Sequence, residues 1–115
     1  MELIHSSNAV YMLASRRHGT IYTGVSGRFL HRISQHREGA IEGFTQRYGV
    51  KRLVWFELHE GIVSAIQREK SIKKYRRQWK INLIERDNPN WEDLYPSFFV
   101  EDGPLAHLAQ REPSF

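Results

Sequence analysis

The sequence predicts a small α/β protein of the α+β kind, with a mainly antiparallel three-stranded sheet flanked by helices. Two short β-prone runs joined by a basic bend, a β-rich run in mid-chain and helical patterns around it predict this class. The expected order of elements is β-β-α-β-α-α. A chain of 115 residues can bury one core and leaves little room for a second domain.

The first two strands are expected at residues 8–14 (NAVYMLA) and 20–25 (TIYTGV), as the arms of one hairpin. Directly opposed residues of an antiparallel hairpin share a face and have a constant sum of positions. A bend centred on residues 16–17 therefore predicts that Tyr11 lies opposite Tyr22, so that one face displays two phenols. An aromatic pair buried in the core explains the same residues without any chemistry.

The remaining elements follow from periodicity and from helix-ending residues. We expect a helix over 28–37, a loop-like stretch over 38–49, a strand over 51–58 and helices over 61–75 and 77–86. The NPNW stretch ends the last helix, because Pro89 disfavours helical backbone at Asn88. From Pro96 onward the chain reads as a tail that docks through Phe98 and Phe99.

Charge is divided unevenly along the chain. Residues 1–84 carry 15 Lys/Arg and 6 Asp/Glu, whereas residues 85–115 carry 2 and 7. We therefore expect a basic domain over 1–95 and an acidic C-terminal tail over 96–115. A basic body favours a polyanionic partner, since clustered cations release counterions from phosphate backbones. A domain with a basic face and no such partner is the alternative.

Other classes of protein are disfavoured by what the sequence lacks. It has no cysteine, which excludes disulfides and cysteine-ligated metals. No apolar run approaches the ~20 residues of a membrane-spanning helix. The N-terminus MELIHSSNAV does not have the order of a secretory signal, and a cytoplasmic location is expected.

The helix expected over 28–37 carries a basic ridge. Arg28, Arg32 and His36 are spaced at i, i+4 and i+8, which predicts that they share one face. A guanidinium binds phosphate in a bidentate manner, and an imidazole transfers protons near neutral pH. A solvated basic ridge without a ligand is the alternative.

The segment 61–84 contains seven Lys/Arg and a single acid, Glu69. Glu69 interrupts an apolar stripe, where a carboxylate is costly unless it is paired or binds a cation. An ion pair with Lys73 or Arg76 is one explanation, and a divalent cation such as Mg²⁺ is the other. The predicted stripe consists of Ile62, Ala65, Ile66, Ile72, Tyr75 and Trp79.

Together these stretches resemble the GIY-YIG nuclease domain family. Ala9-Val10-Tyr11 stands for the first motif and Tyr22-Thr23-Gly24 for the second. RISQH at 32–36 is similar to the family's arginine–histidine helix, and AIQREK at 65–70 to its glutamate-bearing helix. The likeness covers roughly residues 8–95 and is greatest to the small stand-alone branch. The first motif lacks its glycine and isoleucine, and Thr23 replaces the isoleucine of the second.

The resemblance implies a metal-dependent endonuclease that hydrolyses DNA phosphodiesters, one strand per active site. Glu69 would hold Mg²⁺ or Mn²⁺, and Arg32 would neutralise the phosphoryl group. Tyr11 or Tyr22 would activate or position water, with a pKa lowered from about 10 by the arginine and the metal. His36 would assist proton transfer or hold a phosphate.

Three further expectations follow from the resemblance. Gly24 would leave the backbone beside Tyr22 open to a phosphate. Asn88 matches the family's late asparagine and would orient the metal site, with Asn82 as competitor; taken alone, Asn88 is an ordinary turn former. A role in DNA repair or recombination is expected.

The expected DNA-binding surface tracks the backbone without reading sequence, and RNA stays open as a substrate. A nucleic-acid-binding module that keeps the fold without cleavage, or a protein-interaction domain, is the alternative function. The cations expected to contact nucleic acid are Arg16, Arg17, Arg28, Lys70, Lys73, Lys74, Arg76, Arg77 and Lys80.

Overall fold

The computed structural model describes residues 7–39 and 43–99 and confirms the predicted fold class. Its three-stranded sheet has the order β2-β1-β3, and both pairings are antiparallel. The strands are β1 (Asn8–Ala14), β2 (Ile21–Ser26) and β3 (Arg52–His59). The helices are α1 (Phe29–Glu38), α2 (Phe44–Tyr48), α3 (Ile62–Lys73), α4 (Arg77–Asp87) and the 3-10 helix η2 (Tyr95–Phe99).

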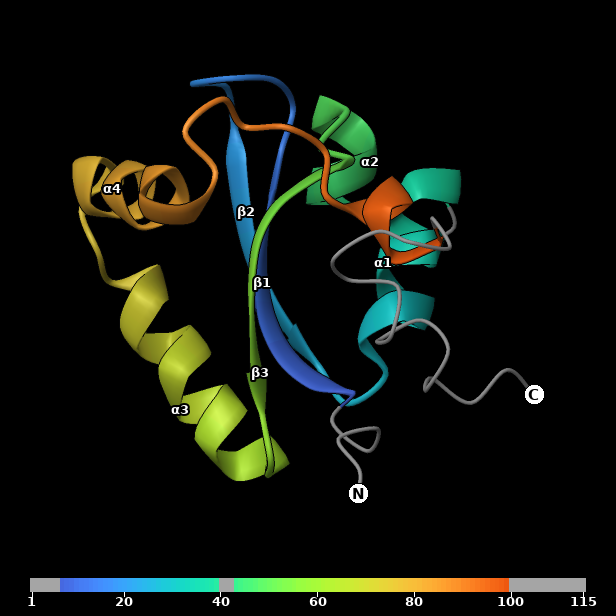
Figure 1. Cartoon of the computed structure of the whole chain (residues 1–115), viewed down its shortest axis with the longest axis vertical. Coiled ribbons are helices and arrows are strands. Elements are labelled where there is room, and N and C mark those ends of the chain that lie inside the picture. The colour runs from blue at the N-terminus through green and yellow to red at the C-terminus, as the bar shows by residue number, and fades with distance from the viewer. Residues whose placement is uncertain (1–6, 40–42, 100–115) are drawn as a thin grey trace.

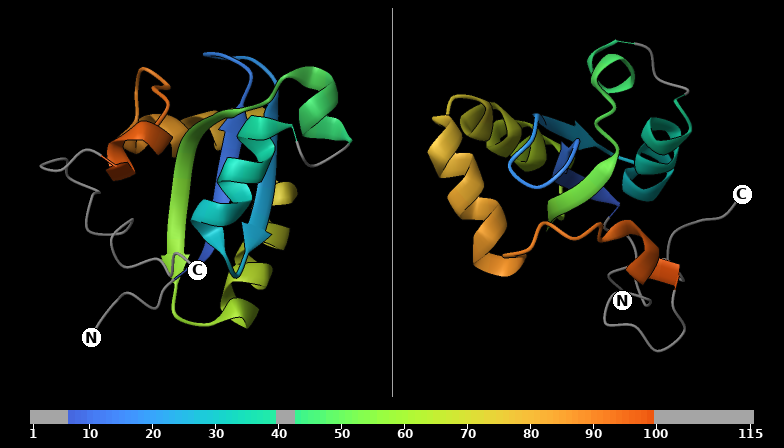
Figure 2. Two further views of the ribbon diagram at one scale, coloured as in Figure 1. Left: turned by 90° about the vertical axis from the view of Figure 1, so that its right-hand side faces the viewer. Right: turned by 90° about the horizontal axis from the view of Figure 1, so that it is seen from above.

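Helices cover both faces of the sheet (Figure 1). Figure 2 shows α3 and α4 on one face and α1 on the other, with β1 in the middle of the sheet. Side chains alternate along β1, so that Val10 and Met12 join the core under α3 and α4. Tyr11 and Leu13 join the core under α1, together with Phe29 and others. The central strand is therefore buried on both sides.

The hairpin register differs from the predicted one. Tyr11 pairs with Gly24, and Tyr22 pairs with Leu13. The bend is centred one residue later than expected, because His18 takes a left-handed conformation with φ 58° and closes the turn. This shift moves each pairing by two positions. A two-residue shift keeps both tyrosines on the same face but places them diagonally.

The stretch expected to be loop-like contains a short helix, α2. Glycines lie at both of its ends, Gly43 with φ 110° and Gly49 with φ 63°. A five-residue helix has too few positions to show helical periodicity, so the sequence pattern did not predict it. By contrast, Phe29, Leu30 and Ile33 of α1 are buried as helical periodicity predicts.

The predicted apolar stripe of residues 61–84 is only partly correct. Ala65 and Ile72 are buried, but Ile62, Ile66 and Trp79 are more than one-third exposed. Ile62 and Ile66 lie within α3 but beside its buried line of Ala65, Glu69 and Ile72. The chain leaves helical geometry between α3 and α4, so Trp79 does not continue the helical phase of α3. The residues after the break consequently face a different direction from the residues before it.

The last described part of the chain packs back onto the sheet. As predicted, α4 ends before the NPNW stretch, at Asp87. The predicted docking of the tail is confirmed for Phe98, which is buried in the core with Phe29, and is wrong for Phe99, which is exposed. The compact unit thus includes Phe98, and the rest of the predicted tail, 100–115, lies outside the described residues.

Candidate active site

Two tyrosines from the hairpin form the centre of the candidate site. Their ring centroids lie 6.5 Å apart, so the phenols are neighbours as predicted, although not directly opposed. Tyr11 is 1% exposed, whereas Tyr22 is half-buried. A Cβ atom at Gly24 would lie 2.7 Å from both Cζ and Oη of Tyr11. The space at Gly24 is therefore filled by the Tyr11 phenol, which corrects the expectation that it leaves the backbone open for a phosphate.

The Tyr11 phenol belongs to a buried hydrogen-bonded chain. Its Oη lies 3.1 Å from Nε2 of His36, and Nδ1 of His36 lies 3.0 Å from Oγ1 of Thr45. A neutral imidazole donates through one nitrogen and accepts through the other. Hydroxyl groups at both ends of the chain suit either tautomer, because each hydroxyl can donate or accept. The arrangement can therefore pass a proton between Tyr11 and His36.

Burial determines the protonation states of this chain. It raises the pKa of Tyr11 well above its usual range, with the Tyr22 phenol adding to the rise and Arg32 opposing it. Burial also lowers the pKa of His36 to about 4, and Arg32 acts in the same direction. Desolvation outweighs the guanidinium, so Arg32 alone does not bring the pKa of Tyr11 below its ordinary value, and the lowering expected from arginine and metal together stays a prediction. Both groups are neutral at pH 7.

The predicted ridge on the first helix is divided between solvent and core. Arg28 precedes α1 as its N-cap residue and is exposed. Arg32 is exposed as well, but His36 is 3% exposed and points into the core. Eight residues turn a helix by about 80° beyond two full circles, which takes His36 off the face of Arg28. Arg32 thus lies at the surface and His36 lies beneath it.

Glu69 comes to this region from α3. Its side chain is only 10% exposed, and its Oε2 lies 2.6 Å from Nζ of Lys73, one helical turn later. This ion pair is one of the two explanations left open for a carboxylate in an apolar stripe. Glu69 is close enough to the phenol of Tyr11 to contribute to the rise of the pKa of Tyr11. Both Arg32 and Glu69 therefore act on the same buried phenol.

Among the described residues, no three His, Cys, Asp or Glu side chains come together as a metal-binding group. A metal at Glu69 would therefore be bound by this one carboxylate among the described residues, and water and phosphate oxygens would fill its other coordination positions. Mg²⁺ is commonly bound in this manner, through one or two carboxylates plus substrate phosphates. The nine-tenths buried carboxylate of Glu69 has the hard oxygen ligands that suit such an ion once its Lys73 partner is displaced.

The late asparagine has a different environment. Asn88 is buried, and its Nδ2 donates to the backbone oxygens of Val54 and Glu92. Its Oδ1 accepts from the backbone N–H of Glu92. These three hydrogen bonds tie the end of α4 to β3 and to the following turn. The competitor Asn82 is exposed and accepts a hydrogen bond from Gln78.

Eight of the nine cations expected to meet nucleic acid lie in the hairpin bend or in residues 70–80, and Arg28 lies apart from them, before α1. Nη2 of Arg77 donates to the backbone oxygens of His18 and Gly19, each at 2.8 Å, and so joins the bend to α4. Lys80 is half-buried and the other eight are exposed: Arg16, Arg17, Arg28, Lys70, Lys73, Lys74, Arg76 and Arg77.

Thr45 is the residue of this site that sequence reasoning missed. It lies on α2, in the stretch expected to be a loop, and is 3% exposed. Nothing in its sequence neighbourhood marks it as a partner of His36, nine positions earlier. Only the return of the chain between α1 and β3 brings the two side chains together.

The arrangement of hairpin tyrosines, arginine–histidine helix and glutamate helix agrees with a known family. A family model described as "GIY-YIG catalytic domain" matches residues 7–82, and the chain belongs to that family. GIY-YIG domains define a nuclease-type family whose members are generally metal-dependent. Within the part of the chain that the structure describes, no helix is long and apolar enough to cross a membrane.

Among individual proteins, the chain is 36% identical over 77 residues to UPF0213 protein CPE1444 of Clostridium perfringens (strain 13 / Type A). This match covers 67% of the chain and 82% of that protein. A UPF0213 protein of Staphylococcus aureus (strain Mu3 / ATCC 700698) is 34% identical over 67 residues, or 58% of this chain and 82% of the other. No solved structure matches significantly.

Proposed function

We propose that the protein is a metal-dependent endonuclease that hydrolyses DNA phosphodiester bonds and cuts one strand per active site. The observation that carries the proposal is that the guanidinium of Arg32 and the buried carboxylate of Glu69 both lie close enough to interact with the Tyr11 phenol, whose ring centroid is 6.5 Å from that of Tyr22. A cation can neutralise the phosphate, a carboxylate can hold a metal ion, and a phenol can position water, so these groups together can serve phosphodiester hydrolysis. Family membership supports the same chemistry.

Glu69 is the proposed ligand of Mg²⁺ or Mn²⁺. When bound there, the ion supplies Lewis-acid stabilisation of the phosphate and of the leaving oxygen. Lys73 holds the carboxylate in the structure described and must release it for this role. Lys73 is more than half exposed, so the released ammonium can remain in solvent or contact a DNA phosphate.

Arg32 is the proposed phosphate clamp. Its guanidinium lies at the surface, where DNA can reach it, and still influences the buried phenol of Tyr11. A planar guanidinium pairs with two phosphate oxygens at once, so it can orient the phosphodiester as well as neutralise charge.

The two tyrosines have different proposed roles. Tyr22 is the more exposed phenol, so we assign to it the contact with the attacking water. Tyr11 is neutral and hydrogen-bonded to His36, which suits it to relay a proton rather than to act as a phenolate. In this relay Tyr11 accepts the proton that the attacking water loses and passes its own hydroxyl proton to Nε2 of His36, while Thr45 bonds Nδ1 of the same ring.

The role of Asn88 in orienting the metal site stays a prediction. In the structure its amide bonds the backbone of Val54 and Glu92 instead. The expected contacts of the surface cations with the DNA backbone, the expected roles in DNA repair or recombination and the cytoplasmic location likewise remain predictions. With the proposed domain over 1–95 and the tail over 96–115, Phe98 is the residue by which the tail docks on the domain.

A plasmid-nicking assay with Mg²⁺ or Mn²⁺ tests the function. We expect wild-type protein to convert supercoiled DNA to the relaxed form, and Glu69→Ala and Arg32→Ala to lose this activity while Glu69→Ala still binds DNA. Glu60→Ala is the control, because Glu60 is an exposed acid at the start of the same helical region. Equal activity of Glu69→Ala and wild type would refute the proposal.

The second candidate is a nucleic-acid-binding domain that does not cut. One observation favours it: the carboxylate needed for the metal is already paired with Lys73 at 2.6 Å. DNA binding by wild-type protein without nicking in either metal would select this candidate over the nuclease.

A further inference from the structure

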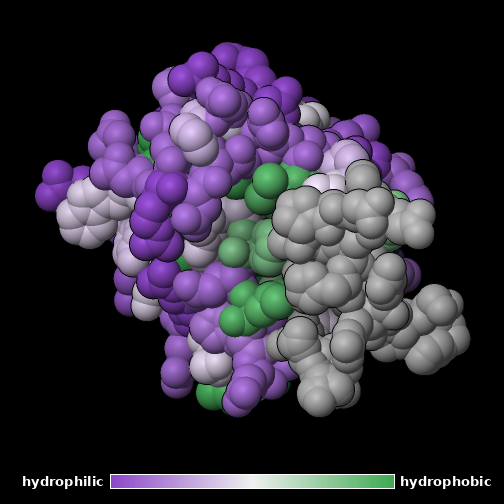
Figure 3. All heavy atoms as spheres, in the orientation of Figure 1, coloured by the Kyte–Doolittle hydropathy of each residue, from purple (hydrophilic) through white to green (hydrophobic). Residues whose placement is uncertain are grey.

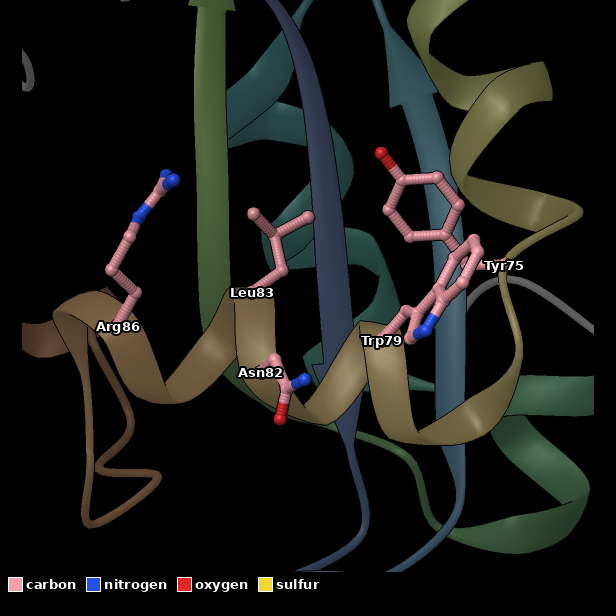
Figure 4. Close-up of a pocket in the computed structure, with 5 residues that line it drawn as sticks. All are labelled: Tyr75, Trp79, Asn82, Leu83 and Arg86. Carbon is pink, nitrogen blue, oxygen red and sulfur yellow. The ribbon is translucent and has the colours of Figure 1, made fainter.

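A surface hollow lies outside the proposed active site, along α4 and the connection that precedes it (Figure 4). Its volume is about 340 Å³, near the lower end of the range for ligand sites, ~300–1,000 Å³. The rings of Tyr75 and Trp79 lie together at one end, Leu83 lies between, and Arg86 lies at the other end. Asn82 completes the lining.

The hollow contains the exposed tryptophan of this protein. Trp79 is 50% exposed, whereas Trp55 and Trp91 are 3% and 0% exposed. The exposed half of the Trp79 indole adds nothing to the core, and partly exposed aromatic rings are typical of binding surfaces. Tyr75 and Trp79 meet edge to face, with ring centroids 5.6 Å apart. Cζ of Arg76 lies 5.1 Å from the centre of the Trp79 ring.

The rings of Tyr75 and Trp79 form the aromatic wall of the hollow, and Tyr75 is held in place by the ion pair of Arg68 and Glu57. Nη1 of Arg68 donates to the hydroxyl of Tyr75 at 3.2 Å, and Nε of the same arginine donates to Glu57 at 3.0 Å. Tyr75 is therefore tied through α3 to the edge strand β3. A wall fixed before binding loses little conformational entropy when a ligand stacks on it.

The charge around the hollow is strongly positive. Residues 70–80 contain six Lys/Arg and no Asp or Glu. The cations crowd one another, since the pKa of Lys80 is lowered by burial and then by Lys73 and Arg77. In the space-filling view the surface over α3 and α4 is mainly hydrophilic (Figure 3). A flat aromatic ligand that carries negative charge suits these surroundings.

We propose that the Tyr75–Trp79 hollow binds an unpaired nucleobase of the nucleic-acid strand that the basic α3–α4 surface holds. An aromatic ring among cations is the arrangement that binds single strands, because bases stack on the ring while the cations follow the phosphates. Bases inside a duplex are already stacked and paired and cannot enter. The substrate class of the proposed nuclease thus includes a single-stranded segment; this inference rests on the proposed function for its biological meaning.

Binding measurements in EDTA test the hollow without cleavage. We expect a fluorescein-labelled thymidine oligonucleotide to bind wild-type protein, and Trp79→Ala to weaken that binding about tenfold. Affinity for a blunt-ended duplex of two fully complementary strands, which has no unpaired base, should be unchanged by the substitution. Trp79→Phe, which keeps a ring, should retain most of the single-strand affinity. Val63→Ala, which removes another exposed apolar side chain, from α3, should have no effect.

Intrinsic fluorescence gives an independent readout, because Trp79 is exposed and the other two tryptophans are buried. The thymidine oligonucleotide should quench wild-type emission and leave Trp79→Phe emission unchanged. Equal loss of single-strand and duplex affinity in Trp79→Ala, or no loss of either, would overturn the inference. If the protein binds single strands at the hollow but nicks no DNA, the nuclease proposal is refuted and the binding site is still supported.

Discussion

At the scale of single residues, the site depends on two small groups that accommodate the Tyr11 phenol and the His36 imidazole. Gly24 leaves the space that the phenol occupies, and Thr45 bonds the far nitrogen of the imidazole. The motif resemblance named the two tyrosines, Arg32 and His36. It gave no sign of Thr45, because a hydrogen bond across two helices has no local sequence pattern.

Replacing Thr45 tests its hold on the imidazole. Thr45→Val keeps the shape of the side chain but leaves Nδ1 of His36 buried without a partner, so we expect the free energy of unfolding to fall by about 1–3 kcal/mol. Ring ¹⁵N shifts should show a changed His36 tautomer in Thr45→Val and an unchanged one in Thr45→Ser, the control that keeps the hydroxyl. Identical His36 shifts in both variants would rule out this role.

Replacing Gly24 tests the fit of the phenol. A Cβ in Gly24→Ala would lie 2.7 Å from Cζ of Tyr11, so the ring must leave the position it has in the structure. We expect a loss of about 1–3 kcal/mol in the free energy of unfolding, measured by urea denaturation. Gly27→Ala is the matched control, since its Cβ would come no nearer than 3.4 Å, to Oδ1 of Asn8. Equal stability of the two variants would exclude a close fit of the phenol against Gly24.

At the scale of elements, long periodic segments were predictable and short or interrupted ones were not. The hydrophobic pattern of the three strands and of α1, α3 and α4 reaches over six to twelve residues. By contrast, α2 is too short for a period. The break between α3 and α4 agrees with the two helices predicted over 61–75 and 77–86, but the predicted apolar stripe continues across it and is wrong at Trp79. The hairpin register was missed because it depends on the backbone of His18.

Asn88 shows how an element can be held by one side chain. Asn88→Ala removes three hydrogen bonds and leaves the oxygen of Val54 buried, so we expect an unfolding free energy lower by about 1–3 kcal/mol. Urea denaturation of this variant and of Asn90→Ala, an exposed neighbour, measures the effect. Full stability together with lost nicking would instead show that Asn88 acts in the catalytic site.

At the scale of the whole molecule, two cores lie on opposite faces of one sheet, and the candidate site involves both. Tyr11 belongs to the core under α1, while Glu69 comes from α3 on the other side of the sheet. The resemblance predicted the group of residues, but not the balance between burial and charge that raises the pKa of Tyr11. That balance depends on the packing of the complete molecule.

The protonation of His36 ties the stability of the fold to pH. Its pKa is lowered to about 4 from the ordinary value of 6.5, so the unfolded chain binds the extra proton between these values. The contribution of neutral His36 to the free energy of unfolding is therefore fully present above pH 6.5. It is lost as pH falls toward 4, and the loss is on the order of 2 kcal/mol. Urea denaturation at pH 7 and pH 4.5 measures the loss, which should be smaller in His36→Gln. An equal loss in both proteins would exclude His36 as its source.

The central claim is that the glutamate of α3 and the buried phenol–imidazole chain face one site. Paramagnetic broadening of the His36 ring signals by Mn²⁺ tests it most directly, with His59 on β3 as the internal reference. We expect Mn²⁺ to broaden the His36 signals more than those of His59, and Glu69→Gln to abolish the difference. Broadening of His36 that is no stronger than that of His59, or that persists in Glu69→Gln, would contradict it.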